Sequence, residues 1–311
     1  MPVLGEGDAR YEITGRLCRA SPASSQPLQI LVHGFTFSRW YWEPEQEQYA
    51  YSVAANVAGY ATFAIDRIGV GESSHPPATA VTLDTNAVAL HQVVQWARAG
   101  RLGGIRPSFV ALAGHSYGTI VATTEASRFG DVDAVIASGF LHDSANGSSR
   151  LLTSFWPAQL DPKFRSASLP LGYLTTLPGA QSGFFAATNT DAVIVREAEA
   201  HKATGTATEL ATVVGWFDPI RRSAIAVPVL VLVGGRDDLF CDEDQHPCRD
   251  GADLIARERS WYPSSPQVVG FVQPGAGHGL ALERNASDGY AAMLTFLDGI
   301  RFAGSWVGAS R

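Results

Sequence analysis

The chain has 311 residues, of which 46% are hydrophobic and 17% are charged, and its net charge is -7. These values are typical of a soluble globular protein with one large α/β domain and an insertion, and they exclude a disordered chain. The negative balance and the lack of a long basic run argue against a nucleic-acid partner. No window reaches the roughly 18 to 20 continuous apolar residues of a membrane span, so we expect none.

The N-terminus and the cysteines bear on the compartment. The first ten residues include Glu6 and Asp8 and lack the apolar core of a signal peptide, so the cytoplasm is the default expectation. Cys241 and Cys248 bracket a polar loop, which favours a disulfide over two idle thiols and leaves Cys18 unpaired. That disulfide would be consistent with secretion. The sequence does not determine the oligomeric state.

Strand and helix patterns alternate along the first 140 residues. Tyr11 to Arg19 alternates as an edge strand does, and Leu28 to Val32 is a buried strand. Thr82 or Asp84 would cap a helix that stops at Gly100. The other expected elements are a helix over 51–58, a strand over 60–65, a strand over 107–113, a helix over 119–128 and a strand over 132–137. This alternation predicts a mostly parallel sheet covered on both faces.

The regular pattern fails between residues 141 and 222, where prolines and glycines interrupt it. We expect a helical cap there, with helices over 191–201 and over 208–216, the second capped by Thr208. The sheet pattern resumes over 227–233, with a helix over 249–258, a strand over 268–272 and a helix over 286–297 that Gly299 ends. The expected domains are a core of residues 1–140 and 223–311 and a cap of residues 141–222.

Gly114-His115-Ser116-Tyr117-Gly118 follows an apolar strand and opens a helix, which is the setting of a nucleophile elbow. The two glycines let strand and helix approach while Ser116 occupies a sharp turn. A serine hydroxyl needs a base and a group that holds the base, as in a Ser-His-Asp triad. His278 lies in a glycine-rich loop after a strand, and Asp237 or Asp238 directly follows another strand. The order Ser, Asp, His along the chain is the one that accompanies the elbow.

These motifs, together with His33-Gly34 and the loop from Asp66 to Ser73, resemble the α/β-hydrolase family over about residues 28–140 and 227–300. The resemblance implies that the cap follows the sixth strand and that Asp237, three residues after Gly234, is the acid. It also implies that the amides of Phe35 and Tyr117 form the oxyanion hole. Asp66 and Arg67 are expected to fix the loop beside the elbow, and His115 is expected to be a packed, orienting residue.

The expected function is a serine hydrolase that cleaves an ester or lactone of a small, fairly apolar molecule through an acyl-enzyme. An acyltransferase or cyclase with the same intermediate, and a lyase or binding protein on the same fold, are the alternatives. We expect no cofactor and no metal, because the histidines lack ligand spacing. Aromatic residues near the oxyanion loop and in the cap are candidates for the substrate pocket: Trp40, Trp42, Trp156, Tyr173, Phe184 and Phe185.

Overall fold

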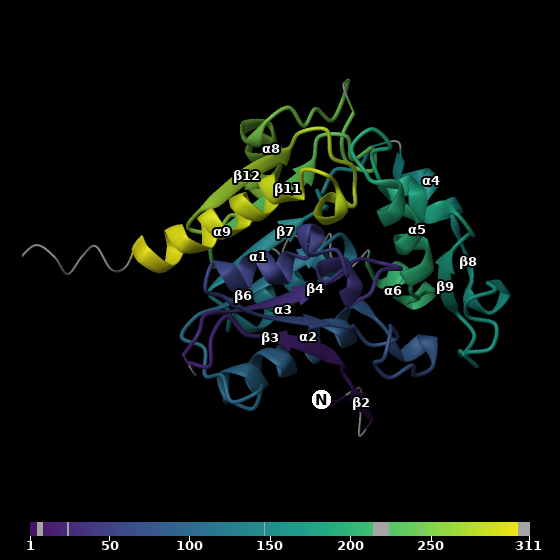
Figure 1. The fold of residues 1–311 in the computed structure, drawn as a ribbon, viewed down its shortest axis with the longest axis horizontal. Coiled ribbons are helices and arrows are strands. Elements are labelled where there is room, and N and C mark those ends of the chain that lie inside the picture. Colours follow the sequence, from purple (N-terminus) through teal and green to yellow (C-terminus); the bar gives the residue numbers. More distant parts are fainter. Residues whose placement is uncertain (5–8, 24, 146, 214–223, 243, 304–311) are drawn as a thin grey trace, which may run out of the picture.

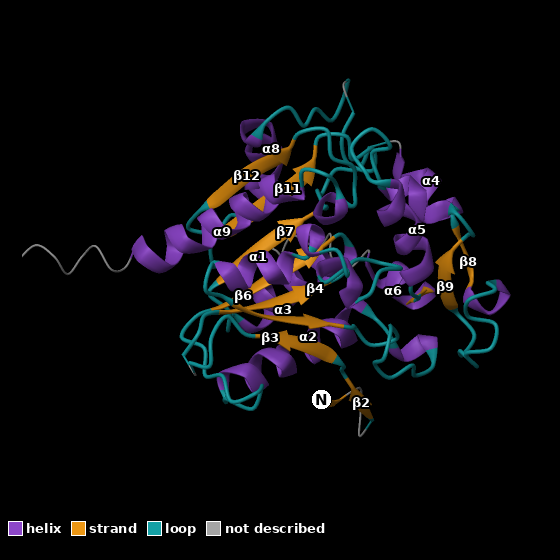
Figure 2. Cartoon of the chain, viewed as in Figure 1, coloured by secondary structure: helices purple, strands orange, loops and turns teal. Residues whose placement is uncertain are grey.

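The computed structural model describes residues 1–4, 9–23, 25–145, 147–213, 224–242 and 244–303. A seven-stranded sheet with the order β12-β11-β7-β6-β4-β5-β3 forms its centre (Figures 1 and 2). All neighbours are parallel except β3, which pairs antiparallel with β5 at one edge. The strands are β3 (Gly15–Cys18), β4 (Leu28–Val32), β5 (Ala61–Ile65), β6 (Val110–His115), β7 (Ala134–Ser138), β11 (Val229–Gly234) and β12 (Val268–Gln273). The predicted mostly parallel sheet is confirmed.

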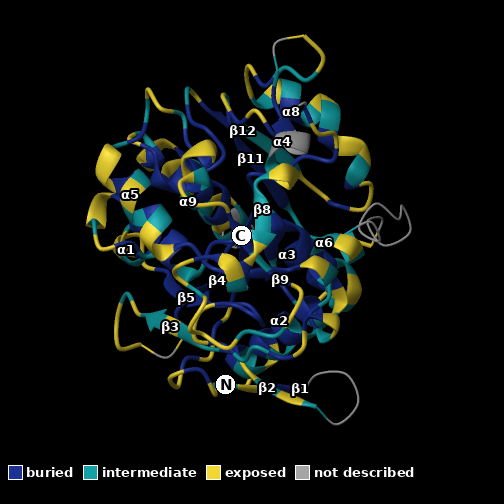
Figure 3. Ribbon diagram, turned by 90° about the vertical axis from the view of Figure 1, so that its right-hand side faces the viewer, coloured by how far each residue is buried: buried dark blue, intermediate teal, exposed yellow. Residues whose placement is uncertain are grey.

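Helices cover both faces of this sheet, which is why its inner strands are mostly apolar and buried (Figure 3). Side chains of α2 (Leu83–Arg98), α3 (Tyr117–Phe129) and α8 (Gly251–Glu258) join one core cluster. Side chains of α1 (Tyr51–Val57) and α9 (Ala286–Ala303) join the cluster on the other face. The predicted edge strand is divided, because β2 (Arg10–Glu12) pairs with β1 (Pro2–Leu4) outside the main sheet.

The long connection between β7 and β11, which we call the insertion (residues 141–222), differs from the expected helical cap. Its described residues form α4 (Gly147–Thr153), α5 (Ala192–His201) and α6 (Ala207–Thr212). They also form a three-stranded antiparallel sheet of β8 (Phe155–Pro157), β9 (Tyr173–Thr176) and β10 (Gly205–Thr206). Strands of two to four residues are too short to show alternation in a sequence. Figure 1 shows these elements gathered beyond one end of the central strands.

Three local expectations need correction or comment. Thr206, not Thr208, caps α6, through a capping box with Glu209; the predicted end of this helix lies partly outside the described residues. Gly299 does not end the last helix, which continues to Ala303. Cys241 and Cys248 are joined as predicted, with their Cα atoms 5.6 Å apart. Within the described ranges, no helix is long and apolar enough to cross a membrane.

Candidate active site

The residues expected to carry the chemistry lie at one edge of the sheet, where the parallel strands end. Phe35 follows β4, Ser116 follows β6, Asp237 follows β11 and His278 follows β12. Because parallel strands present their carboxyl ends at the same edge, loops far apart in sequence meet there. The insertion lies beyond the same edge (Figure 1). This edge is therefore the place to examine for a reactive site.

Ser116 occupies the turn between β6 and α3 in a backbone conformation that costs free energy. Its φ is 53° and its ψ is -121°, a region that residues with a side chain rarely adopt. A Cβ atom on Gly114 would lie 2.5 Å from Gly118 O, and one on Gly118 would lie 2.2 Å from Val32 O. The amide of Ser116 donates to Ser138 O at 2.8 Å, which ties the turn to β7. The two glycines are thus needed for the close packing of strand, turn and helix.

His278 and Asp237 form a buried hydrogen-bonded pair. The His278 Nδ1 atom lies 2.8 Å from Asp237 Oδ2, and both side chains are almost wholly buried. The other carboxylate oxygen of Asp237 accepts a hydrogen bond from the Leu239 amide at 3.2 Å. Asp238, by contrast, is exposed. An aspartate on Nδ1 favours the tautomer that carries a proton there, which leaves Nε2 able to accept one.

His115, directly before the serine, holds the backbone of His278. Its Nε2 atom lies 2.9 Å from the His278 carbonyl oxygen, and its ring stacks on Tyr41 with a centroid distance of 4.0 Å. Burial, followed by the proximity of His278, lowers the pKa of His115 well below its usual value. The ring is therefore neutral at neutral pH, and Nε2 carries the proton that it donates to the carbonyl. This contact holds the His278 loop against the turn that Ser116 occupies.

Two backbone amides near the turn have no partner of their own. Among the hydrogen bonds of the described residues, none uses the amide of Phe35 or that of Tyr117. The loop after β4 is held in shape by Thr36, whose φ is 60° and whose carbonyl accepts the Ala203 amide of the insertion at 2.8 Å. Gln181, also from the insertion, donates to Thr36 Oγ1 at 3.3 Å. Sequence analysis missed both the strain at Thr36 and its partners.

A buried ion pair joins the insertion to the sheet edge. The guanidinium of Arg67 pairs with Glu209 at the start of α6 and lies 4.7 Å from the centroid of the Tyr117 ring. Arg67 Nε also donates to His33 O at 3.3 Å. Glu209 accepts a further hydrogen bond from Asn86 Nδ2 at 3.1 Å. Arg67 thus fixes the loops around the elbow, as expected from its position. Glu209 belongs to the local Thr206-x-x-Glu209 capping-box pattern, but this pattern does not indicate its pairing with Arg67.

Glu283 fixes the His278 loop, much as Arg67 fixes the loops around the elbow. One carboxylate oxygen accepts the amides of Gly277 at 2.9 Å and Ala186 at 2.8 Å, and the other accepts Thr190 Oγ1 at 2.8 Å. Burial raises the pKa of Glu283, and these hydrogen bonds oppose that rise. Glu283 therefore links the His278 loop to the insertion. Its sequence neighbours gave no signal for this role.

A cavity of about 230 Å³ lies between the insertion and the loop after β11, and neither Ser116 nor His278 lines it. Leu151 and Phe184 line it from the insertion, and Leu239, two residues after Asp237, lines it from the core. The Phe184 ring centroid is 5.5 Å from that of His278. The volume is below the range of about 300 to 1,000 Å³ that drug-sized ligands occupy. The space therefore fits a small group with apolar contacts.

The other predicted pocket aromatics have different surroundings. Trp42 and Tyr173 are fully buried in packed clusters, so neither presents a surface to a ligand. Phe185 packs in the core beside Gly279, and Trp156 lies half-buried in β8. Trp40 lines a different cavity. The sequence around these aromatic residues has no regular helix or strand pattern. It therefore could not show which of them pack in the core and which line a pocket.

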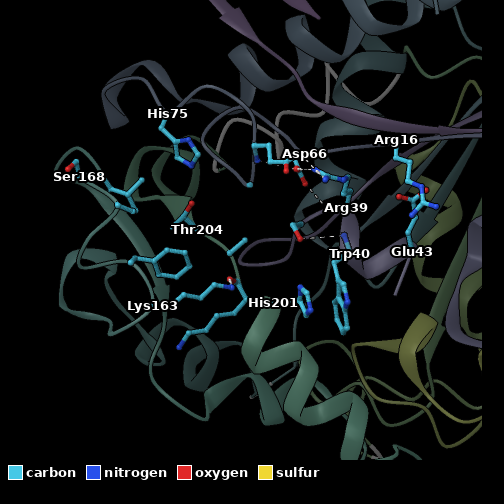
Figure 4. Close-up of a pocket in the computed structure, with 18 of the residues that line it drawn as sticks. Arg16, Arg39, Trp40, Glu43, Asp66, His75, Lys163, Ser168, His201 and Thr204 are labelled. Carbon is cyan, nitrogen blue, oxygen red and sulfur yellow. Dashed lines mark hydrogen bonds and ion pairs between the residues drawn. The ribbon is translucent and has the colours of Figure 1, made fainter. Parts of the chain in front are cut away.

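That second cavity, of about 670 Å³, lies between the loops after β4 and β5 and the insertion, and neither Ser116 nor His278 lines it. Figure 4 shows the ring of His201 against Trp40, and Arg39 directed at Asp66. Its charged groups are largely paired within the protein; buried Lys202, for example, binds Asp161 at 2.8 Å. Its residues stabilise the loops, and the cavity lies apart from the Asp237 and His278 pair.

The class of protein follows from this fold and from comparison with known proteins. The model of the alpha/beta hydrolase family matches residues 29–293. The chain belongs to the α/β hydrolase family. No curated protein matches the sequence significantly.

Solved structures share the fold at low sequence identity. A putative aryl esterase from Burkholderia cenocepacia is 16% identical, with a TM-score of 0.64 over 96% of this chain and 98% of the other. The enol-lactonase from Burkholderia xenovorans is 15% identical, with a TM-score of 0.62 over 96% and 100%. An esterase from Thermogutta terrifontis is 18% identical, with a TM-score of 0.61 over 96% and 98%. At such identities the likeness shows the fold, and the family supports a hydrolase in general.

Proposed function

We propose that the protein is a carboxylic-ester hydrolase that cleaves an ester or lactone of a small, fairly apolar molecule. The observation that carries the proposal is the 2.8 Å contact between His278 Nδ1 and buried Asp237, held against the strained turn of Ser116. A positioned base with an oriented tautomer is what a serine hydroxyl needs to become a nucleophile. The esterase and lactonase among the solved structures agree with this class of reaction but do not identify the substrate.

In the proposed mechanism, Ser116 Oγ attacks the carbonyl carbon while His278 Nε2 takes its proton. Asp237 stabilises the imidazolium that results. The unpartnered amides of Phe35 and Tyr117 receive the oxyanion, a contribution of about 2.7 to 4 kcal/mol for each donor. His278 then protonates the leaving alcohol and later activates the water that releases the acid. The insertion holds the oxyanion loop through Gln181 and Ala203 and the base loop through Ala186 and Thr190, so it supports the chemistry from outside the sheet.

The 230 Å³ cavity beside His278 is the proposed place for the smaller part of the substrate. Its apolar wall of Leu151, Phe184 and Leu239 favours a short hydrocarbon group over a charged one. Short-chain aryl and alkyl esters and small lactones are therefore the appropriate panel of substrates.

The test compares hydrolysis of this panel by the wild type, Ser116→Ala, His278→Ala and the double variant. Each single change should lower kcat by roughly 10⁴-fold or more, and the double variant should be scarcely slower, because the groups act as a unit. If the loss in the double variant were instead the product of the two single losses, Ser116 and His278 would act independently, which would contradict the proposed mechanism. Product analysis with an added alcohol distinguishes hydrolysis from acyl transfer.

A further inference from the structure

A cluster of potential metal ligands lies outside the candidate active site, on the face covered by α2 and α3. It consists of His91 from α2, Glu125 from α3 and Asp131 from the loop after α3. His91 Nδ1 lies 3.0 Å from Asp131 Oδ2 and 3.5 Å from Glu125 Oε1, and one ligand atom from each residue lies within 4.8 Å of the others. The residues are far apart in sequence, which explains why ligand spacing gave no indication of them.

Glu125 is the unusual member of this cluster. Its side chain is fully buried, yet neither carboxylate oxygen has a hydrogen-bond partner. Nδ1 of His91 and Oδ1 of Asp131 also have no hydrogen-bond partner. A buried carboxylate without hydrogen bonds costs several kcal/mol unless a positive charge or a proton compensates it.

The geometry of the cluster is compatible with a bound cation. Zn²⁺ binds imidazole nitrogen and carboxylate oxygen at about 2.0 to 2.2 Å, so neighbouring ligands of a tetrahedral site lie about 3.3 to 3.6 Å apart. The two distances from His91 are close to this range. One imidazole with two carboxylates suits a transition metal better than Mg²⁺ or Ca²⁺, which prefer oxygen alone.

We propose that His91, Glu125 and Asp131 bind a divalent transition-metal cation, with Zn²⁺ as the best match and water as the fourth ligand. His91 and Asp131 are partly exposed, so solvent reaches the site. Supporting contacts orient both residues: the His91 ring stacks on Phe129 at 3.8 Å, and Gln95 Nε2 donates to the Asp131 carboxylate. The cation joins α2 to the last turns of α3, the helix that Ser116 begins. Its role is structural, since the site is separate from the reacting groups.

The test is isothermal titration of the chelator-treated, dialysed full chain with ZnCl₂. The wild type should bind one Zn²⁺ per chain, and Glu125→Gln should weaken binding by at least about tenfold, the lower limit for loss of even an outer-shell partner. At the same concentration, Zn²⁺ should also raise the Tm of the wild type more than that of Glu125→Gln. Asp131→Asn, a change at a partly exposed residue, serves as a second variant if Glu125→Gln does not fold.

His246→Gln is the matched control, because His246 Nδ1 also lies 2.8 Å from an aspartate, Asp242, but the pair is partly exposed and no third ligand joins it among the described residues. This variant should bind Zn²⁺ as the wild type does. The proposal is overturned if the wild type shows no saturable site, if Glu125→Gln or Asp131→Asn binds with wild-type affinity, or if His246→Gln loses the site. Equal affinity for Ca²⁺ would overturn the assignment to a transition metal.

Discussion

At the scale of single residues, the choice between two adjacent aspartates is the sharpest feature of the candidate site. Asp237 is buried and contacts His278 Nδ1, whereas Asp238 is exposed. Asp237→Asn should lower kcat by roughly 10⁴-fold, as for the acid of other Ser-His-Asp triads, because the amide favours the wrong tautomer. Asp238 lines the 230 Å³ cavity, and Asp238→Asn should lower kcat far less than Asp237→Asn does in the same ester assay. Similar losses in both variants would contradict the role of Asp237.

The residues predicted from sequence and those that were missed differ in how far their partners lie along the chain. The sharp turn at Ser116 could be predicted because its neighbours Gly114 and Gly118 form a local motif that the turn geometry requires. The contacts of Glu209 with Arg67 and of Glu283 with Ala186 could not be predicted, since these partners are close only in the folded chain. Arg67, for example, is 142 residues from Glu209. Local sequence patterns predict turns and strand ends, but they do not show which buried acidic side chain pairs with which buried basic one.

At the scale of elements, we predict opposite effects on stability when glycine is changed to alanine at the elbow (Gly118) and in α9 (Gly299). Gly118→Ala would place a methyl group 2.2 Å from Val32 O and 2.6 Å from His33 O, both of them backbone atoms. We expect a loss of about 3 kcal/mol or more in the free energy of unfolding, the upper end of the cost of overpacking.

Gly299→Ala is the matched change, because Gly299 is exposed within α9 and a Cβ atom there meets nothing within 4 Å. It should stabilise the protein by up to about 1 kcal/mol, the difference in helix propensity between the two residues. Urea unfolding followed by circular dichroism measures both variants. Destabilisation by Gly299→Ala would show that the helix does not continue through this position, and a neutral Gly118→Ala would contradict the close packing at the elbow.

Elements with strong periodicity were predicted well, and short elements were not. The buried strands and α2 have long apolar patterns and clear caps, such as Thr82, whose side chain accepts the Thr85 amide. The insertion strands have two to four residues, and tertiary contacts determine their pairing. Gly299 was taken for a stop signal because glycine is common after helices, but the packing of α9 on the sheet overrides this preference.

At the scale of the whole molecule, the buried pair of Arg67 and Glu209 connects the insertion to the sheet. Both side chains are nearly inaccessible, at 1% and 0% exposure. Glu209→Gln leaves the Arg67 charge buried without a counter-charge, so we expect a loss of about 3 to 5 kcal/mol in the free energy of unfolding. Urea denaturation measures this loss.

Arg249→Gln provides the comparison, because Arg249 pairs with Asp253 at 2.8 Å on the surface, where its own side chain is 76% exposed. Removing such an exposed pair should change the free energy of unfolding far less than Glu209→Gln does. Equal losses in the two variants would show that the buried pair does not hold the insertion against the core.

The central proposal is that Ser116 is a nucleophile activated by His278, and covalent labelling tests it most directly. A serine-directed fluorophosphonate should add one group to the wild-type chain, and peptide mapping by mass spectrometry should locate it on Ser116. Ser116→Ala should not be labelled, and its circular dichroism spectrum should be unchanged. His278→Ala should react far more slowly than the wild type, because the Ser116 hydroxyl then has no base. A label on another residue, or no label on a wild type that hydrolyses esters, would contradict the account.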